Sequence, residues 1–205
     1  MIKPVGSDEL RPLFVYDPDT HHQLMHEAES LPSVVISSQA AGNAVMMGGG
    51  YFTPLNGFMN LADAMGACEG MRLQDGSFFP VPVLCLLESV EAIGDARRIA
   101  LRDPNMEGNP VLAVMDVEAI EEVSGDQMAF MTEKVYRTTD TEQPGVAAFN
   151  GLGRLAVSGP IQVLHFSYFQ DVFPDTFRTA VEIRNEIAER GWKRVVAFQT
   201  RNPMH

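Results

Sequence analysis

The feature that most constrains how this chain can fold is a change of pattern near residue 166. Beyond it, Thr179 followed by Glu182 matches a capping box, in which the threonine caps a helix and the glutamate reaches back to it. The helix is expected to end at Gly191, since glycine is the usual residue just past a helix. Residues 195–198, VVAF, are typical of a parallel strand that is buried on both faces. A helix leading into such a strand predicts the beginning of an α/β domain.

The residues before this change carry short apolar runs separated by turn residues. Strands are expected at residues 78–87, 99–101 and 111–120. Helices are expected at residues 17–31 and 126–136. The glycine triplet at residues 48–50 predicts a tight turn, although such a run can also form an anion-binding nest. Short strands at this spacing predict a compact β-rich domain, a barrel or a sandwich, so the fold class is α+β.

The charge is distributed unevenly between these two parts. Residues 166–205 carry six basic and five acidic side chains, whereas the first 165 residues carry nine basic and 22 acidic ones, for net charges of +1 and −13. An acidic surface repels a phosphate backbone, which Lys and Arg must neutralise for non-specific nucleic-acid binding. Nucleic acid is therefore not an expected partner. A small anion would need local donors acting against an unfavourable long-range field.

No segment of the sequence predicts secretion or membrane insertion. The longest apolar stretch, residues 78–87, contains two prolines and is much shorter than the roughly 20 residues of a membrane span. The first ten residues carry charge and proline where a signal peptide would be apolar. Two cysteines, Cys68 and Cys85, cannot build a disulfide framework or a four-ligand metal site by themselves. We expect a cytoplasmic protein with reduced thiols and no membrane partner.

The seven residues after the expected strand, QTRNPMH, contain side chains that suit an oxyanion. Arg201 offers a planar fork for bidentate pairing, Gln199 and Asn202 offer amide donors, and His205 can donate from a ring nitrogen. Ligands of open α/β sheets bind just beyond the carboxyl ends of strands, where this segment would lie. The alternative is a polar loop from strand to helix, with Pro203 in the first helical turn.

This segment also resembles the start of the ATP sulfurylase signature QxRNPxHxxH. Further ordered runs carry the same resemblance: PLNGFM at 54–59, MRLQDG at 71–76, ALRDP at 100–104, TDTEQPGV at 139–146, GPIQVL at 159–164 and RGWKRVVAFQTRNPMH at 190–205. Several runs in the same order are far more specific than one motif. The chain is therefore identified as a relative of the ATP sulfurylase family.

The resemblance implies two domains and one reaction. Residues 1–165 would form a PUA-like β-barrel domain with helices, and residues 166–205 the truncated start of a Rossmann-like nucleotidyltransferase domain. The implied reaction converts ATP and sulfate into adenosine 5′-phosphosulfate and pyrophosphate, or the reverse. Mg²⁺ would arrive with ATP, with no protein metal site identifiable in the sequence. The family is often oligomeric, so a homo-oligomer is expected.

The resemblance also assigns roles within the last seven residues. Gln199 and Arg201 would hold sulfate, while Gln199, Asn202 and His205 would bind the nucleotide. Arg201, Asn202 and His205 would be the catalytic side chains. A sulfate oxygen would attack the α-phosphorus in line, so catalysis would depend on positioning and on donors aimed at developing charge.

The second histidine of the signature is not among these 205 residues. We therefore expect the fragment alone to be inactive and the activity to belong to a longer parent enzyme. Two other readings remain open. One is a non-catalytic PUA-like module that binds RNA, and the other is a different adenylyl- or cytidylyltransferase with a related HxxH phosphate site.

Overall fold

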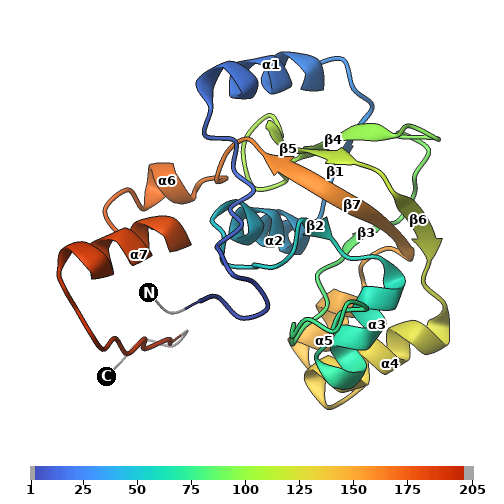
Figure 1. The fold of residues 1–205 in the computed structure, drawn as a ribbon. Helices are drawn as coiled ribbons and strands as arrows, with labels where there is room; N and C mark the ends of the chain where they lie inside the picture. Colours follow the sequence, from blue (N-terminus) through green and yellow to red (C-terminus); the bar gives the residue numbers. More distant parts are fainter. Residues whose placement is uncertain (1–2, 201–205) are drawn as a thin grey trace.

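The computed structural model describes residues 3–200 and combines a curled sheet with surrounding helices (Figure 1). Its strands are β1 (Ser33–Val35), β2 (Gly57–Phe58), β3 (Cys85–Leu87), β4 (Arg98–Arg102), β5 (Val111–Asp116), β6 (Ala119–Glu122) and β7 (Leu155–Val163). Its helices are α1 (Pro18–Ala28), α2 (Ser38–Gly48), α3 (Leu61–Gly70), α4 (Gly125–Tyr136), α5 (Pro144–Asn150), α6 (Phe169–Val172) and α7 (Ala180–Glu189). The fold is α+β, as expected.

Strand β7 organises the sheet because four other strands pair with it. The main path runs β1-β4-β5-β7-β2, and β3 and β6 also pair with β7. All these pairs are antiparallel except β1 with β4. Residues 155–158 of β7 pair with β3 and β6, whereas residues 159–163 pair with β2 and β5. Gly159 lies at this change of partners with φ +144°. The two halves of β7 therefore pair with different strands on either side of a bend, and this bend curls the sheet.

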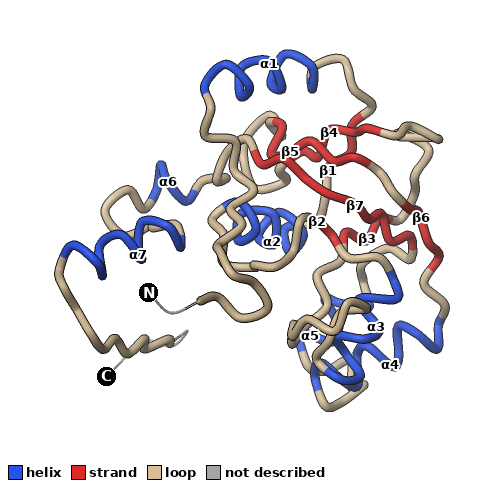
Figure 2. The backbone as a smooth tube through the Cα atoms, viewed as in Figure 1, coloured by secondary structure: helices blue, strands red, loops and turns tan. Residues whose placement is uncertain are grey.

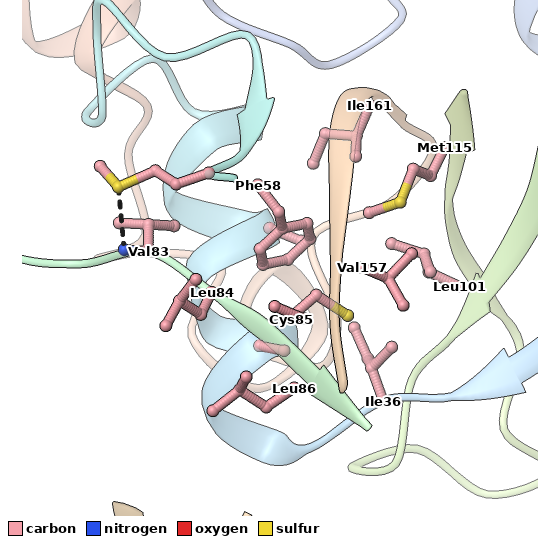
Figure 3. Close-up of a cluster of buried hydrophobic side chains, with 14 of the residues drawn as sticks. Ile36, Phe58, Val83, Leu84, Cys85, Leu86, Leu101, Met115, Val157 and Ile161 are labelled. Atoms are coloured by element: carbon pink, nitrogen blue, oxygen red, sulfur yellow. Dashed lines mark hydrogen bonds between the residues drawn. The ribbon is translucent and has the colours of Figure 1, made fainter. Parts of the chain in front are cut away.

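The main core lies inside this curl (Figure 3). Strand β5 supplies five consecutive buried residues, and β3 is buried throughout. Figure 3 shows Phe58, Cys85 and Val157 converging from three different strands. Burying one large apolar side chain contributes about 1.5–3 kcal/mol relative to leaving it exposed, so this cluster is the principal source of stability.

Helices cover the sheet and one of its ends. Leu24 and Ala28 of α1 pack against Ala100 and Val114, while α2 lies against β7 through its alanines and Gly48. Helices α3, α4 and α5 gather at one end of the sheet, and α6 and α7 lie on another side of the molecule (Figure 1).

Much of the expected secondary structure is confirmed, with differences in extent. The helices expected at 126–136 and after Thr179 are α4 and α7, and the helix expected at 17–31 is α1, which ends earlier, at Ala28. The glycine triplet ends α2 in a turn with Gly50 at φ +82°. The strand expected at 111–120 is two strands, β5 and β6, and only Cys85–Leu87 of residues 78–87 forms a strand. Helices α2, α3 and α5 were not expected. Ser37 and Asn60, which cap α2 and α3, are preferred N-cap residues and thus short-range signals of these helices. Gln143, which caps α5, is not a preferred cap.

The buried strand expected at residues 195–198 is wrong for the described structure. These residues form neither helix nor strand, as the loop colouring of Figure 2 shows. Val196 is 93% exposed and Phe198 is 79% exposed. A strand needs a hydrogen-bonding neighbour, and in residues 3–200 no other strand pairs with this segment.

Candidate active-site segment and its anchoring

The segment after β7 is tied to the body of the protein by a buried aromatic group. Phe166 is 2% exposed and stacks on Phe14 with ring centroids 4.6 Å apart. Phe177 lies 5.3 Å from Phe166 between ring centroids and thereby brings the later chain back to the same cluster. Next to Phe166, the Leu164 carbonyl lies 2.7 Å from Nε2 of His21 on α1. These contacts fix the path of the chain as it leaves the sheet.

Helix α7 docks through its first turn. The Ala180 N–H donates to the Gly49 carbonyl at 2.9 Å, and the Tyr51 hydroxyl donates to the Arg178 carbonyl at 2.7 Å. The acceptor Gly49 and the donor Tyr51 lie in, and directly after, the glycine turn that ends α2. That turn therefore places the start of the helix that leads towards Gln199.

The capping box of α7 forms as the sequence predicted. Oε2 of Glu182 accepts from the Thr179 N–H at 2.7 Å and from the Thr179 hydroxyl at 2.8 Å, while the Glu182 N–H donates to Thr179 Oγ1. The backbone N–H of Thr179, followed by its hydroxyl, holds the pKa of Glu182 below its ordinary value. Thr179 itself is 3% exposed, so this cap is built into the docking site.

Beyond α7 the chain is exposed up to residue 200. Gly191 ends the helix with φ +64°, and the Arg190 guanidinium lies 5.0 Å from the Trp192 ring centroid. Gln199 is exposed and outside any helix or strand. Arg201, Asn202 and His205 lie outside the described residues. Gln199 is therefore the one predicted site residue that lies within the described structure.

A separate polar cavity of about 330 Å³ lies where several distant segments meet. Its lining includes residues 54–60, residues 73–75 and Gly159, and so draws on three of the runs that carry the family resemblance. Asn60 caps α3 here, and its Oδ1 also lies 3.3 Å from Nε2 of Gln74. The cavity could not be predicted from the sequence, because its lining residues come from separate runs that meet only in the folded chain.

The charges around this cavity are mostly negative. Asp63, Asp75 and Glu118 line it together with Arg11. The Ser77 N–H donates to Asp75 Oδ1 at 2.8 Å, and this hydrogen bond is the main cause of a lowered pKa for Asp75. Such a lining suits hydrogen-bonding or cationic groups and disfavours sulfate or phosphate. The cavity is therefore not a second candidate for the oxyanion site.

The described part of the chain does not fit a resident metal. Across residues 3–200, no three His, Cys, Asp or Glu side chains are grouped closely enough to hold an ion. In the same range, none of the helices has the length and apolar character needed to span a bilayer.

Comparison with known proteins identifies the larger part of the chain. Residues 2–166 match the model of the PUA-like domain family. The chain belongs to this family. Residues 174–205 match the model of the ATP-sulfurylase family, so the resemblance seen in the sequence is confirmed.

Curated relatives agree over the full length of the chain. The sulfate adenylyltransferase of Allochromatium vinosum is 74% identical over all 205 residues, which are 52% of that protein. The corresponding protein of the Riftia pachyptila sulfur-oxidizing endosymbiont is 75% identical over 205 residues and 46% of its length. The chain thus spans about half the length of the curated relatives it matches.

A solved structure shares the fold. It is described as a hexameric APS kinase from Thiobacillus denitrificans, and it superimposes with a TM-score of 0.73 at 28% identity. The match covers 100% of this chain and 35% of the solved one.

Proposed function

We propose that this chain is part of a sulfate adenylyltransferase, the enzyme that interconverts ATP plus sulfate and adenosine 5′-phosphosulfate plus pyrophosphate. The observation that carries the proposal is the 74% identity, over the whole chain, to the Allochromatium vinosum protein of that name. Residues 1–165 are the PUA-like domain and residues 166–205 begin the nucleotidyltransferase domain. The ATP-sulfurylase match over residues 174–205 supports this division.

In the proposed reaction a sulfate oxygen attacks the α-phosphorus of ATP and forms a new P–O bond. The bond from the α-phosphorus to the bridging oxygen breaks, and pyrophosphate leaves with that electron pair. Gln199 and Arg201 hold the sulfate, and Gln199, Asn202 and His205 bind the nucleotide. No protein nucleophile is needed, so Arg201, Asn202 and His205 act by positioning and by stabilising developing negative charge.

The apolar segment before these residues supports a role for additional protein. Val196 and Phe198 are largely exposed here, at a cost that a completed parallel sheet would remove. The chain spans about half of its curated relatives, which leaves about half of each relative to supply such neighbours. We therefore propose that the 205 residues alone are inactive.

The remaining assignments follow from the same proposal. Mg²⁺ is carried by ATP. The substrates are small molecules, with neither nucleic acid nor lipid as a partner, and the protein works in the cytoplasm. A homo-oligomer is proposed because the APS kinase of similar fold is described as hexameric.

Steady-state kinetics on the parent-length protein test the proposal. Arg201→Lys keeps the charge and loses the planar fork, so turnover should fall by a factor of roughly 30 to 1000, equivalent to about 2–4 kcal/mol. Gln199→Ala should weaken the use of sulfate more than that of ATP, and His205→Ala should do the reverse. Arg194→Lys is the matched control and should change neither. Near-normal turnover of Arg201→Lys with sulfate would overturn the assigned role.

Two measurements separate the alternatives. Sulfate should raise the thermal stability of the parent protein more than phosphate or acetate does, because a ligand that binds the native state stabilises it. Equal protection by phosphate would favour another HxxH nucleotidyltransferase. Salt-sensitive retention of RNA in filter binding would favour the PUA-like binding module, which the acidic first 165 residues oppose.

A further inference from the structure

The short connection between the two family matches contains a strained residue. Residues 167–173 lie between the PUA-like match and the ATP-sulfurylase match. Ser167 opens this connection with φ +55°, in the left-handed region that a serine rarely adopts. It is 5% exposed. A non-glycine residue keeps such a conformation only when its surroundings enforce it.

One hydrogen bond ties Ser167 to the last residues of the PUA-like match. The Ser167 N–H donates to Nδ1 of His165 at 2.9 Å. To accept this bond, Nδ1 must carry a lone pair, so the imidazole is neutral with its proton on Nε2. Protonation would place an N–H on Nδ1, directly against the N–H of Ser167. The bond and a charged ring are therefore mutually exclusive.

On the other side of the ring, the Val111 backbone, Asp103 and Asp171 favour a charge, but the effect of burial is larger. Nε2 of His165 is buried near the Val111 backbone without a well-formed hydrogen bond in the described part of the chain. Oδ2 of Asp103 and the Ser167 hydroxyl are likewise buried without a hydrogen bond to any described residue. A charged imidazolium here would have to be solvated by rearranging the connection.

We propose that His165 is a proton-responsive latch that fixes the connection between the PUA-like domain and the chain that follows it. The neutral ring accepts the Ser167 N–H and enforces the left-handed turn, and the protonated ring releases it. Release frees Ser167 to return to an ordinary backbone conformation and turns the segment that begins α6. The device lies outside the substrate-binding residues and does not depend on the proposed reaction.

Three titratable groups act on the ring from the elements around it. His21 of α1 disfavours a second positive charge, whereas Asp103 after β4 and Asp171 of α6 favour it. Burial is the largest influence, and the pKa of His165 is lowered overall. A lowered histidine pKa means that the latch is closed above the ordinary pKa of about 6.5 and opens as the pH falls through the folded value.

Hydrogen exchange on the 205-residue chain tests the latch. The protection factor of a peptide covering residues 167–173, divided by that of a β5 peptide, would be followed from pH 7.5 to 5.0. This ratio of protection factors should fall by at most about tenfold for each unit by which the pH is lowered, since one proton is taken up. In His165→Asn it should stay constant, because Asn Oδ1 occupies the place of Nδ1 and does not titrate. The exposed His22→Asn is the control and should behave as the wild type.

Either of two results would overturn the proposal: a constant ratio in the wild type, or an equal fall in His165→Asn. Should His165→Asn fail to fold, nitrogen chemical shifts of the wild-type imidazole decide the matter. The proposal requires an unprotonated Nδ1 at pH 7.5 and a ring titration that coincides with the loss of protection. A proton on Nδ1 at pH 7.5 would exclude it.

Discussion

Gly57 and Gly159 pack backbone against backbone where β2 meets β7, so that a Cβ on Gly57 would lie 2.0 Å from the Gly159 carbonyl oxygen. Gly159 is equally confined, since its own Cβ would lie 2.0 Å from the Asp116 carbonyl oxygen. The two glycines belong to the runs PLNGFM and GPIQVL, and both line the polar cavity. Their role is to let three backbone segments meet at the bend of β7.

Replacing Gly57 by alanine should therefore be strongly destabilising. The new methyl group meets backbone atoms that cannot rotate away, so we expect a loss of about 3 kcal/mol or more, at the upper end of overpacking costs. Urea unfolding followed by circular dichroism measures it. Gly42→Ala is the matched control, because nothing lies within 4 Å of its Cβ position in α2. It should gain about 0.5–1 kcal/mol from helix propensity. A loss below about 1 kcal/mol for Gly57→Ala would contradict the packing described.

Removing the Tyr51 hydroxyl should loosen α7 without unfolding the sheet. Tyr51→Phe deletes the 2.7 Å hydrogen bond to the Arg178 carbonyl, at an expected cost of about 0.5–1.5 kcal/mol to docking. Amide exchange in α7 should accelerate while exchange in β5 is unchanged. Tyr136→Phe serves as the control, since its hydroxyl makes no hydrogen bond to the described residues. Unchanged α7 exchange in Tyr51→Phe would show that the Ala180–Gly49 bond alone holds the helix.

The capping box predicts an acid-sensitive start of α7. Because the folded pKa of Glu182 is lowered, its contribution is present above the ordinary glutamate pKa of about 4.3 and is lost as the pH falls through the folded value. Protection of the first turn of α7 should therefore drop between about pH 5 and pH 3. Glu182→Gln should flatten this dependence, and Thr179→Ala should cost about 0.5–2 kcal/mol at any pH as a lost cap. A pH profile of Glu182→Gln identical to the wild type would reject the assignment.

The two thiols should be nearly unreactive in the folded chain. Burial raises the pKa of Cys68 to about 11 and that of Cys85 to about 12. Relative to an ordinary thiol near 8.5, the thiolate fraction at pH 7.5 falls by roughly a hundredfold or more. In Cys68→Ser, labelling of Cys85 by a disulfide reagent should be limited by unfolding, and urea should accelerate it. Rapid labelling of Cys85 in native buffer would contradict its complete burial.

Signals carried by a few neighbouring residues were predictable from the sequence. Thr179, Glu182 and Gly191 specify the two ends of α7 through local hydrogen bonds and backbone conformation, and the structure confirms them. Helix α2 was missed because Gly42 and Asn43 made a segment of low helix propensity. The helix forms because its caps and its buried alanines, packed against β7, outweigh that propensity.

Features that depend on distant residues were not predictable. An apolar run such as residues 195–198 indicates a preference for burial but not whether a neighbouring strand exists to provide it. The polar cavity is lined by segments that lie between Gly6 and Gly159 in the sequence, and no local sequence pattern predicts that these segments come together. For the oxyanion segment, residue chemistry alone suggested a function, and the family resemblance specified which one.

The bend of β7 also has a mechanical consequence. The chain leaves β7 directly into the aromatic anchor, so tension applied to the C-terminal part is transmitted along this strand. Its hydrogen bonds to β5, β2, β3 and β6 run across that direction and would be loaded together in shear, not one after another. The PUA-like domain should therefore resist force applied through its C-terminal end, because that force acts on β7, the strand with the most pairing partners.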